Sequence, residues 1–174
     1  RLRVDASGVI FVGSTSFSED GSTNSIKIHP HEILTGTTTT AANTHLAFSN
    51  PNGRVGSITT NGSGTAYNTS SDYRLKEAVV EMTGAIDRVK ALAPKRFQFI
   101  ADADTTVDGF LAHEAQAVVP EAVTGTKDEV DEDGNAVMQG IDQSKLVPLL
   151  TGALKEAIAK IETLETKVAA LEGN

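Results

Sequence analysis

The feature that most constrains the fold is a seven-residue repeat of apolar side chains in the last part of the chain. From residue 147 on, an apolar residue opens each heptad and another stands at its fourth position: Val147, Leu154, Ile161 and Val168, and Leu150, Ala157, Leu164 and Leu171. A strict heptad repeat makes a seam that a single helix cannot bury, so it predicts a partner helix. We expect a long coiled-coil helix over about residues 144–172 with a seam that includes Leu154, Ile161, Leu164, Val168 and Leu171.

The charges beside this seam indicate the direction of the partner. Lys160 and Lys167 stand at the last heptad position, and Glu165 and Glu172 stand at the fifth. In a parallel assembly each lysine lies near the glutamate five residues later in the neighbouring helix, although each exposed pair contributes little. The mixed first-position residues fit a dimer as well as a trimer, and an amphipathic helix packed on its own domain is the alternative to both.

Residues 1–70 have a different character and predict short strands. They are rich in Thr, Ser, Asn and Gly, Ile26 and Ile28 alternate with polar residues, and so do Leu46 and Phe48. The segment 50–53, Asn-Pro-Asn-Gly, has good turn chemistry, and a last short strand is expected around 57–60. Large apolar residues are few, so one chain would bury little core, and threefold association of such strands solves this difficulty. We therefore expect a parallel homotrimer.

The second half, residues 71–174, predicts a mixture of helices and short strands. The expected elements are a helix capped by Thr83 and ended by Pro94, strands at Phe97 to Phe99 and at Phe110 to Leu111, a helix over 112–119 stopped by Pro120, a hairpin tip at Asp133-Gly134, and the long helix. The expected fold class is α+β, ending in a long coiled-coil helix and preceded by a β-rich trimeric segment.

Composition excludes several classes of function. Residues 71–174 hold 11 basic and 19 acidic side chains and so carry the whole net charge of −8, which argues against a nucleic-acid partner. The chain has no cysteine for thiol or zinc chemistry, and no run of about 18 apolar residues for membrane insertion. His29 and His31 are interpreted as a surface loop, so we expect no metal and no cofactor. Because the sequence begins at Arg1 rather than Met, we expect a piece of a longer chain.

The most informative segment, residues 70–77, lies between the two halves and reads Ser-Ser-Asp-Tyr-Arg-Leu-Lys-Glu. From the residues alone, Ser71 or Asp72 could simply cap a helical turn. However, Ser71 to Lys76 resembles the signature of the intramolecular chaperone domain of phage tail fibres and tail spikes, a self-cleaving peptidase with a Ser–Lys dyad. Further motifs follow in that family's order: Gly-Phe-Leu-Ala-His-Glu at 109–114, Pro-Glu-Ala-Val at 120–123, and Ser-Lys-Leu-Val-Pro-Leu-Leu at 144–150 before the coiled coil. The resemblance covers roughly residue 52 to the C-terminus, and residues 2–8 resemble tail-fibre repeats more weakly.

The resemblance implies that Ser71 is a nucleophile that attacks the carbonyl of Ser70, and that the Ser70–Ser71 bond is cut. Lys76 matches the family's lysine and can act as the base only when it is neutral, a form that burial or a nearby cation such as Arg74 would favour. On one helix the two residues would stand about 140° apart, so either Ser71 lies outside the helix or the lysine comes from a neighbouring chain. Asp72, His113 and Glu114 are possible supporting residues. The last two lie in a motif that we expect to be mainly structural, although a His–Glu pair could act as acid and base.

Together these observations predict a shaft end over 1–70 and a chaperone and auto-cleavage domain over 71–174. The expected function is to drive trimerisation and folding of the shaft, followed by release at Ser70–Ser71. The alternatives are an uncleaved trimeric fibre tip that binds a host surface receptor, or a plain trimerisation clamp. The expected partners are two further copies of the chain and the rest of the tail fibre. The expected location is the virion tail, after assembly in the host bacterial cytoplasm.

Overall fold

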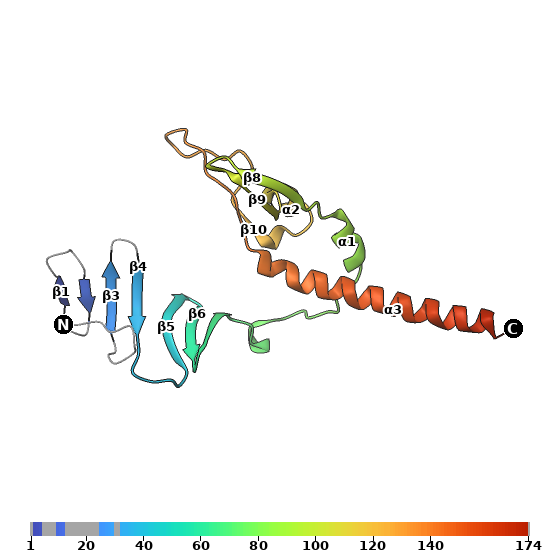
Figure 1. Cartoon of the computed structure of the whole chain (residues 1–174), viewed down its shortest axis with the longest axis horizontal. Coiled ribbons are helices and arrows are strands. Elements are labelled where there is room, and N and C mark those ends of the chain that lie inside the picture. Colours follow the sequence, from blue (N-terminus) through green and yellow to red (C-terminus); the bar gives the residue numbers. More distant parts are fainter. Residues whose placement is uncertain (1, 5–9, 13–24, 30–31, 174) are drawn as a thin grey trace. The chain divides into compact units, whose positions relative to one another are not determined.

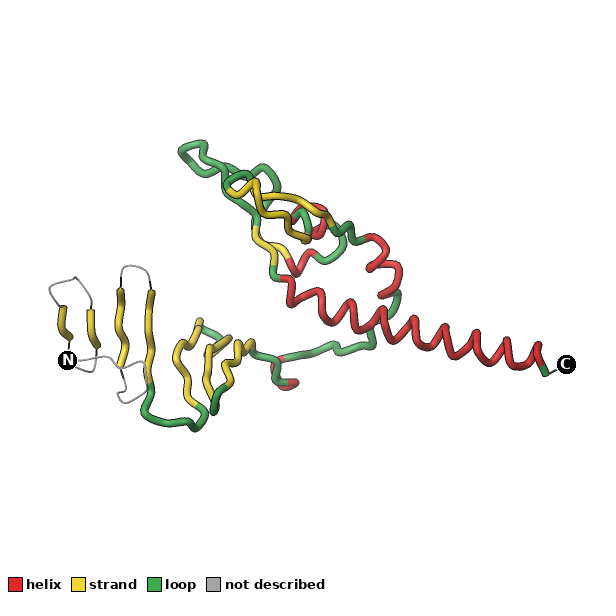
Figure 2. Tube along the Cα trace, viewed as in Figure 1, coloured by secondary structure: helices red, strands yellow, loops and turns green. Residues whose placement is uncertain are grey.

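A computed structural model describes residues 2–4, 10–12, 25–29 and 32–173 of the 174-residue chain. It contains two compact units, Arg1–Val79 and Val80–Asn174, which are described separately (Figure 1). The chain is of mixed α and β type, with small antiparallel sheets and a long C-terminal helix, as the sequence predicts (Figure 2). The weak repeat resemblance at 2–8 and the histidine loop at 29–31 fall partly outside the described residues.

The described residues of the first unit form two antiparallel sheets. The first has the order β1 (Leu2–Val4), β2 (Ile10–Val12), β3 (Ser25–His29), β4 (Glu32–Gly36), and the second has the order β5 (Asn43–Asn50), β6 (Gly53–Asn61), β7 (Gly64–Thr69). The alternation at Ile26 and Leu46 is confirmed as strand, and the 57–60 strand is confirmed as part of the longer β6. β4 and β7 were not predicted.

The turn between β5 and β6 confirms the chemistry expected at 50–53. The Asn52 amide donates to Asn50 Oδ1 at 2.9 Å, and Gly53 has a φ of +95°, which glycine adopts without strain. Across the same pair of strands, Leu46 lies opposite Ile58 and Phe48 opposite Gly56. Both Leu46 and Phe48 are nevertheless exposed, and no described side chain of this unit is buried. The unit therefore has little core of its own within one chain.

The second unit packs α1 (Ala85–Ala91), α2 (Ala112–Gln116) and the start of α3 (Leu146–Glu172) around a small apolar core. Its strands form two short ladders, β8 (Lys95–Phe99) with β9 (Asp102–Gly109), and β10 (Val123–Thr124) with β11 (Gly140–Ile141). The described part of the chain also contains the 3₁₀ turns η1 (Tyr73–Leu75) in the first unit, and η2 (Pro120–Ala122) and η3 (Gln143–Lys145) in the second. The buried core comprises Ala85, Ala115, Val119, Ala122, Val123, Leu146 and Leu149.

The helix expected after Thr83 is confirmed, but its cap is not Thr83. The residue before α1 is Gly84, with a φ of +70° and no side chain to cap the helix. Instead Glu156, on α3, accepts the Ala85 amide at 2.8 Å and the Ile86 amide at 3.0 Å. These bonds satisfy two of the unpaired amides at the helix start and hold the pKa of Glu156 below its usual range. A cap contributed from 70 residues away carries no local sequence signal.

A second prediction was also wrong: Phe110 and Leu111 do not form a strand. β9 ends at Gly109, opposite Lys95, because Pro94 precedes Lys95 and offers no amide to continue the ladder. Phe110 packs against the core, and Leu111 is the residue before α2. The helix expected over 112–119 is confirmed over Ala112–Gln116. The expected hairpin tip is confirmed by a single bridge between Val130 and Ala136, with Gly134 at a φ of +82°.

Candidate active site around Ser71 and Lys76

The predicted cleavage bond lies where the second sheet of the first unit ends. β7 pairs with β6 up to Thr69 opposite Gly56. Ser70 continues this attachment, because its amide donates to the Val55 carbonyl oxygen at 3.0 Å and its hydroxyl donates to the Arg54 carbonyl oxygen at 2.9 Å. The residue on the N-terminal side of the bond is thus fixed to a strand by two hydrogen bonds, and the chain leaves the sheet at Ser71.

The residues after Ser71 fold back on it through one tight turn. Asp72 is the N-cap of η1, and its side chain accepts the Arg74 amide at 2.9 Å. The turn closes with the Lys76 amide donating to the Tyr73 carbonyl oxygen at 3.1 Å. Asp72 and Lys76 have extended backbone on either side of this single turn. Ser71 therefore lies outside the helix, which is one of the two arrangements that the spacing of five residues allowed.

This turn brings the two predicted catalytic side chains into contact. Lys76 Nζ donates to Ser71 Oγ at 2.7 Å. If the amine is neutral, the same pair of atoms can share the hydroxyl proton in the opposite sense, with Ser71 donating. The Ser71 hydroxyl also belongs to the residue that directly follows the carbonyl of Ser70. The arrangement places a hydroxyl, an amine and a peptide carbonyl within one short segment of one chain.

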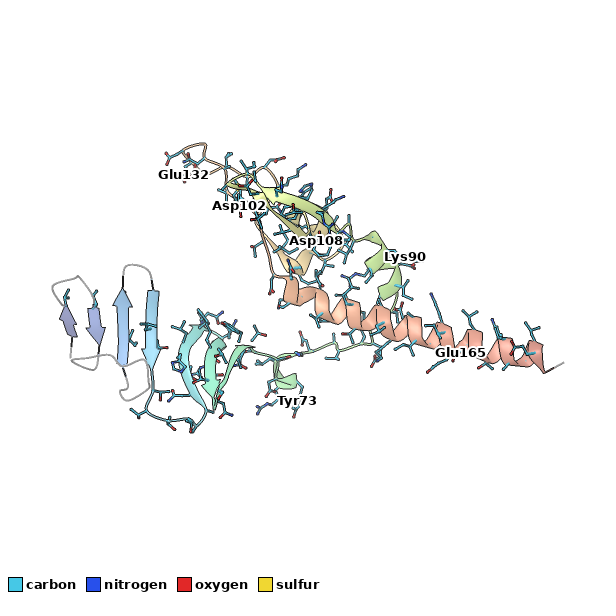
Figure 3. The ribbon with its side chains drawn as sticks, in the orientation of Figure 1. Tyr73, Lys90, Asp102, Asp108, Glu132 and Glu165 are labelled. Carbon is cyan, nitrogen blue, oxygen red and sulfur yellow. The ribbon has the colours of Figure 1, made fainter. Side chains whose placement is uncertain are left out.

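Asp72 and Arg74 form the charged part of the same turn. Arg74 Nε donates to Asp72 Oδ1 at 2.9 Å, and Arg74 Nη2 donates to Asp72 Oδ2 at 2.8 Å. This fork holds the pKa of the Asp72 carboxyl below its usual range, with smaller contributions from the Arg74 amide and from the charge of Lys76. Ser71, Asp72, Arg74 and Lys76 are all exposed in the isolated chain, as is Tyr73, which Figure 3 labels on this turn.

His113 and Glu114 lie in the second unit, on α2, and both are half-buried. Lys95 Nζ approaches Glu114 Oε2 at 3.3 Å, an ion pair that connects α2 to the start of β8. That buried oxygen accepts no hydrogen bond of good geometry among the described residues. The contact links two elements of the fold, so it favours the structural interpretation of this motif, which stays a prediction.

The predicted seam residues lie on α3 and are open to solvent in the single chain. Leu154, Ile161, Leu164, Val168 and Leu171 are all exposed, and Leu164 has 59 % of its surface accessible. The start of the same helix uses a neighbouring face, since Leu146 and Leu149 are buried in the core of the unit. Figure 3 labels Glu165 on the part of α3 that extends beyond α1. The helix is thus packed on its own domain along one face and presents an unpartnered apolar stripe along another.

Other kinds of site are not found in the part of the chain that the structure describes. No three His, Asp or Glu side chains there are placed to hold a metal ion. No described helix is both long and apolar enough to cross a membrane.

Comparison with known families supports the interpretation of this turn. The family model described as chaperone of endosialidase matches residues 71–124, so the match begins at Ser71 and includes the turn and the helix of His113. Residues 71–124 are a chaperone of endosialidase domain. The resemblance expected from the sequence is confirmed for these residues. The family implies a self-cleaving serine peptidase, and its domains act in trimeric phage fibres. No curated protein matches the chain.

Sequence reasoning predicted a site of Ser71, Asp72, Arg74 and Lys76 but missed the residues that hold the other side of the predicted cleavage bond. The hydroxyl of Ser70 and the carbonyl of Arg54 meet only because β6 and β7 are paired. No local signal could reveal that contact, since Gly64–Thr69 carries Tyr67 as its one large apolar side chain.

Proposed function

We propose that the chain is the C-terminal region of a phage tail fibre or spike whose chaperone of endosialidase domain trimerises and folds the β-rich shaft and then cuts itself off at Ser70–Ser71. The contact of 2.7 Å between Lys76 Nζ and Ser71 Oγ carries this proposal, because it lies at the point where the sheet ends. The functional boundary that we propose, between residues 70 and 71, stands within the first compact unit.

The chemistry proceeds in two steps. Neutral Lys76 takes the hydroxyl proton of Ser71 while Ser71 Oγ attacks the carbonyl carbon of Ser70. The bond from that carbon to the Ser71 nitrogen breaks, the nitrogen receives a proton, and an ester joins Ser70 to Ser71. Water then hydrolyses the ester, which leaves a carboxylate on Ser70 and restores the Ser71 hydroxyl. The two hydrogen bonds on Ser70 hold the acyl group in place during both steps.

The folding role follows from the different composition of the two halves. The first unit exposes Leu46, Phe48 and Val55 in one chain and so needs neighbouring chains to cover them. Pairing between chains is non-local and slow, which exposes such strands to aggregation. A parallel coiled coil formed by α3 would hold three chains together and raise their effective concentration. We propose that the chain's partners are two further copies and the rest of the fibre, with assembly in the host bacterial cytoplasm and final location in the virion tail.

The test of the dyad is a set of single substitutions. Ser71→Ala removes the nucleophile and Lys76→Ala removes the base, so both should abolish the new N-terminus at Ser71. Lys76→Arg should be equally inactive because guanidinium stays protonated at any usable pH. Lys90→Arg is the matched control on an exposed lysine of α1, and it should cleave like the wild type. N-terminal sequencing of the products decides the outcome, and cleavage at another bond would contradict the assignment.

A mixing experiment separates action within a chain from action between chains. Ser71→Ala chains are assembled together with Lys76→Ala chains. The contact within one chain favours action in cis, so mixed trimers should show no cleavage of the Lys76→Ala chains. Recovery of cleavage would show that the lysine of one chain serves the serine of its neighbour.

A further inference from the structure

The carboxylate of Asp72 lies between two cations of the same turn. It accepts three hydrogen bonds from Arg74: Nε and the backbone amide both reach Oδ1 at 2.9 Å, and Nη2 reaches Oδ2 at 2.8 Å. Lys76 is close enough for its charge to act on the same carboxylate. Arg74 therefore engages both oxygens of the acidic residue that directly follows Ser71.

The alternative partner for this carboxylate is the proposed base itself. If Arg74 released Asp72, an ion pair with Lys76 would stabilise the charged ammonium, and an opposite charge at short range raises the pH at which such a group loses its proton. The same ion pair would compete with Ser71 Oγ for Lys76 Nζ. Either effect would withhold the neutral amine that the reaction needs.

We propose that Arg74 is a positioning residue that keeps the Asp72 carboxylate away from Lys76 and so leaves the amine free to accept the Ser71 proton. This inference rests on the proposed cleavage function. It differs from the simpler expectation that Arg74 repels Lys76 directly, because here Arg74 acts through Asp72. The two accounts diverge when Asp72 is neutralised.

Other charged groups near the turn do not share this arrangement. Glu77 follows Lys76, the Tyr73 phenol is exposed on η1, and Arg54 on β6 contributes its backbone carbonyl to Ser70. The charge of Lys76 helps to hold the pKa of the Asp72 carboxyl below its usual range. The fork between Asp72 and Arg74 is therefore the feature to perturb.

The experiment is a double-mutant cycle on the full chain, measured as the rate of cleavage against pH. In Arg74→Gln, Asp72 is free to pair with Lys76, so the pH range over which the cleavage rate increases should shift upward by about one unit. At a fixed pH within that range, cleavage should be about tenfold slower than in the wild type. Asp72→Asn alone keeps a good N-cap for the turn and should show no such displacement. The double variant Asp72→Asn with Arg74→Gln should cleave within about twofold of the rate of Asp72→Asn alone at the same pH, since no carboxylate remains to hold Lys76.

Two results overturn the inference while leaving the proposed function intact. One is an Arg74→Gln variant whose cleavage rate depends on pH as in the wild type. The other is a double variant whose pH dependence is still shifted upward, because this would mean that Arg74 acts on Lys76 by direct repulsion. A wild-type chain that does not cleave at any pH overturns both proposals. A titration of the Lys76 side chain by NMR in a Ser71→Ala background gives a readout without turnover. There Arg74→Gln should move the midpoint of the Lys76 titration to higher pH, and an unmoved midpoint would contradict the role of Arg74.

Discussion

Leu149 tests whether one face of α3 packs in the core of its own unit while another face forms the seam. Its side chain is 2 % exposed and belongs to a buried cluster that otherwise contains Leu146, Val119, Val123 and three alanines. Leu149→Ala removes buried apolar atoms and leaves a cavity, which commonly costs about 2–5 kcal/mol. The alanines have no side chain long enough to move into that space, so we expect the upper part of the range, about 3–5 kcal/mol per chain. That loss is a large fraction of the total stability of a small domain.

The matched control is the same substitution at the next residue. Leu150 occupies the fourth heptad position and is 49 % exposed in the single chain, so Leu150→Ala should weaken association rather than the core. Urea unfolding followed by circular dichroism at 222 nm should show a lower free energy of unfolding for Leu149→Ala at every protein concentration. For Leu150→Ala, the free energy of unfolding should equal that of the wild type below the concentration at which light scattering shows dissociation. A loss under about 1 kcal/mol for Leu149→Ala, or equal losses for both variants in dissociated chains, would refute the two-face account.

Leu164→Asp brings several charges together in one apolar layer of the proposed seam. Light scattering should therefore show monomers at micromolar concentration, where we expect the wild type to be a trimer, and an unchanged oligomer would contradict the seam. Glu156 has a lowered pKa, so its contribution to stability is present above the ordinary carboxyl range and is lost as pH falls through the lowered value. Glu156→Gln should therefore reduce the loss of thermal stability at acid pH, measured by thermal unfolding, and an unchanged loss would argue against the cap. Deleting residues 71–174 before expression should leave the shaft aggregated in a sedimentation assay, whereas a soluble trimer of residues 1–70 would exclude the chaperone role.

Local patterns were enough to predict the elements whose side chains repeat regularly. The heptads predicted α3, the alternation of Phe97 and Phe99 predicted β8, and the Asn-Pro-Asn-Gly segment predicted the turn before Gly53. β9 was missed because Asp102–Gly109 is a run of polar residues that becomes a strand only by pairing with β8. The capping of α1 by Glu156 was missed for a similar reason, since it joins residues far apart in sequence.

The candidate site shows the same division between local and long-range information. The motif resemblance identified Ser71 and Lys76, and the family comparison supports it with a match that begins at Ser71. The spacing of five residues indicated that the pair could not share one helix, but it did not reveal the single 3₁₀ turn and the Asp72–Arg74 fork that bring the two together. The hydrogen bond from Ser70 to β6 depends on the pairing of β6 with β7, which no local motif predicts.

The most direct test of the central claim is intact mass spectrometry of the freshly purified protein and of the same sample after prolonged incubation. Hydrolysis at Ser70–Ser71 predicts two products, residues 1–70 and residues 71–174, whose masses add up to that of the whole chain plus one water. Both should grow at the expense of the intact mass, and faster at higher pH because only the neutral amine of Lys76 can accept the proton. The Ser71→Ala chain should keep its full mass under the same conditions. A wild-type trimer that keeps its intact mass throughout would contradict self-cleavage and leave an uncleaved trimerisation clamp or receptor-binding tip as the function of this chain.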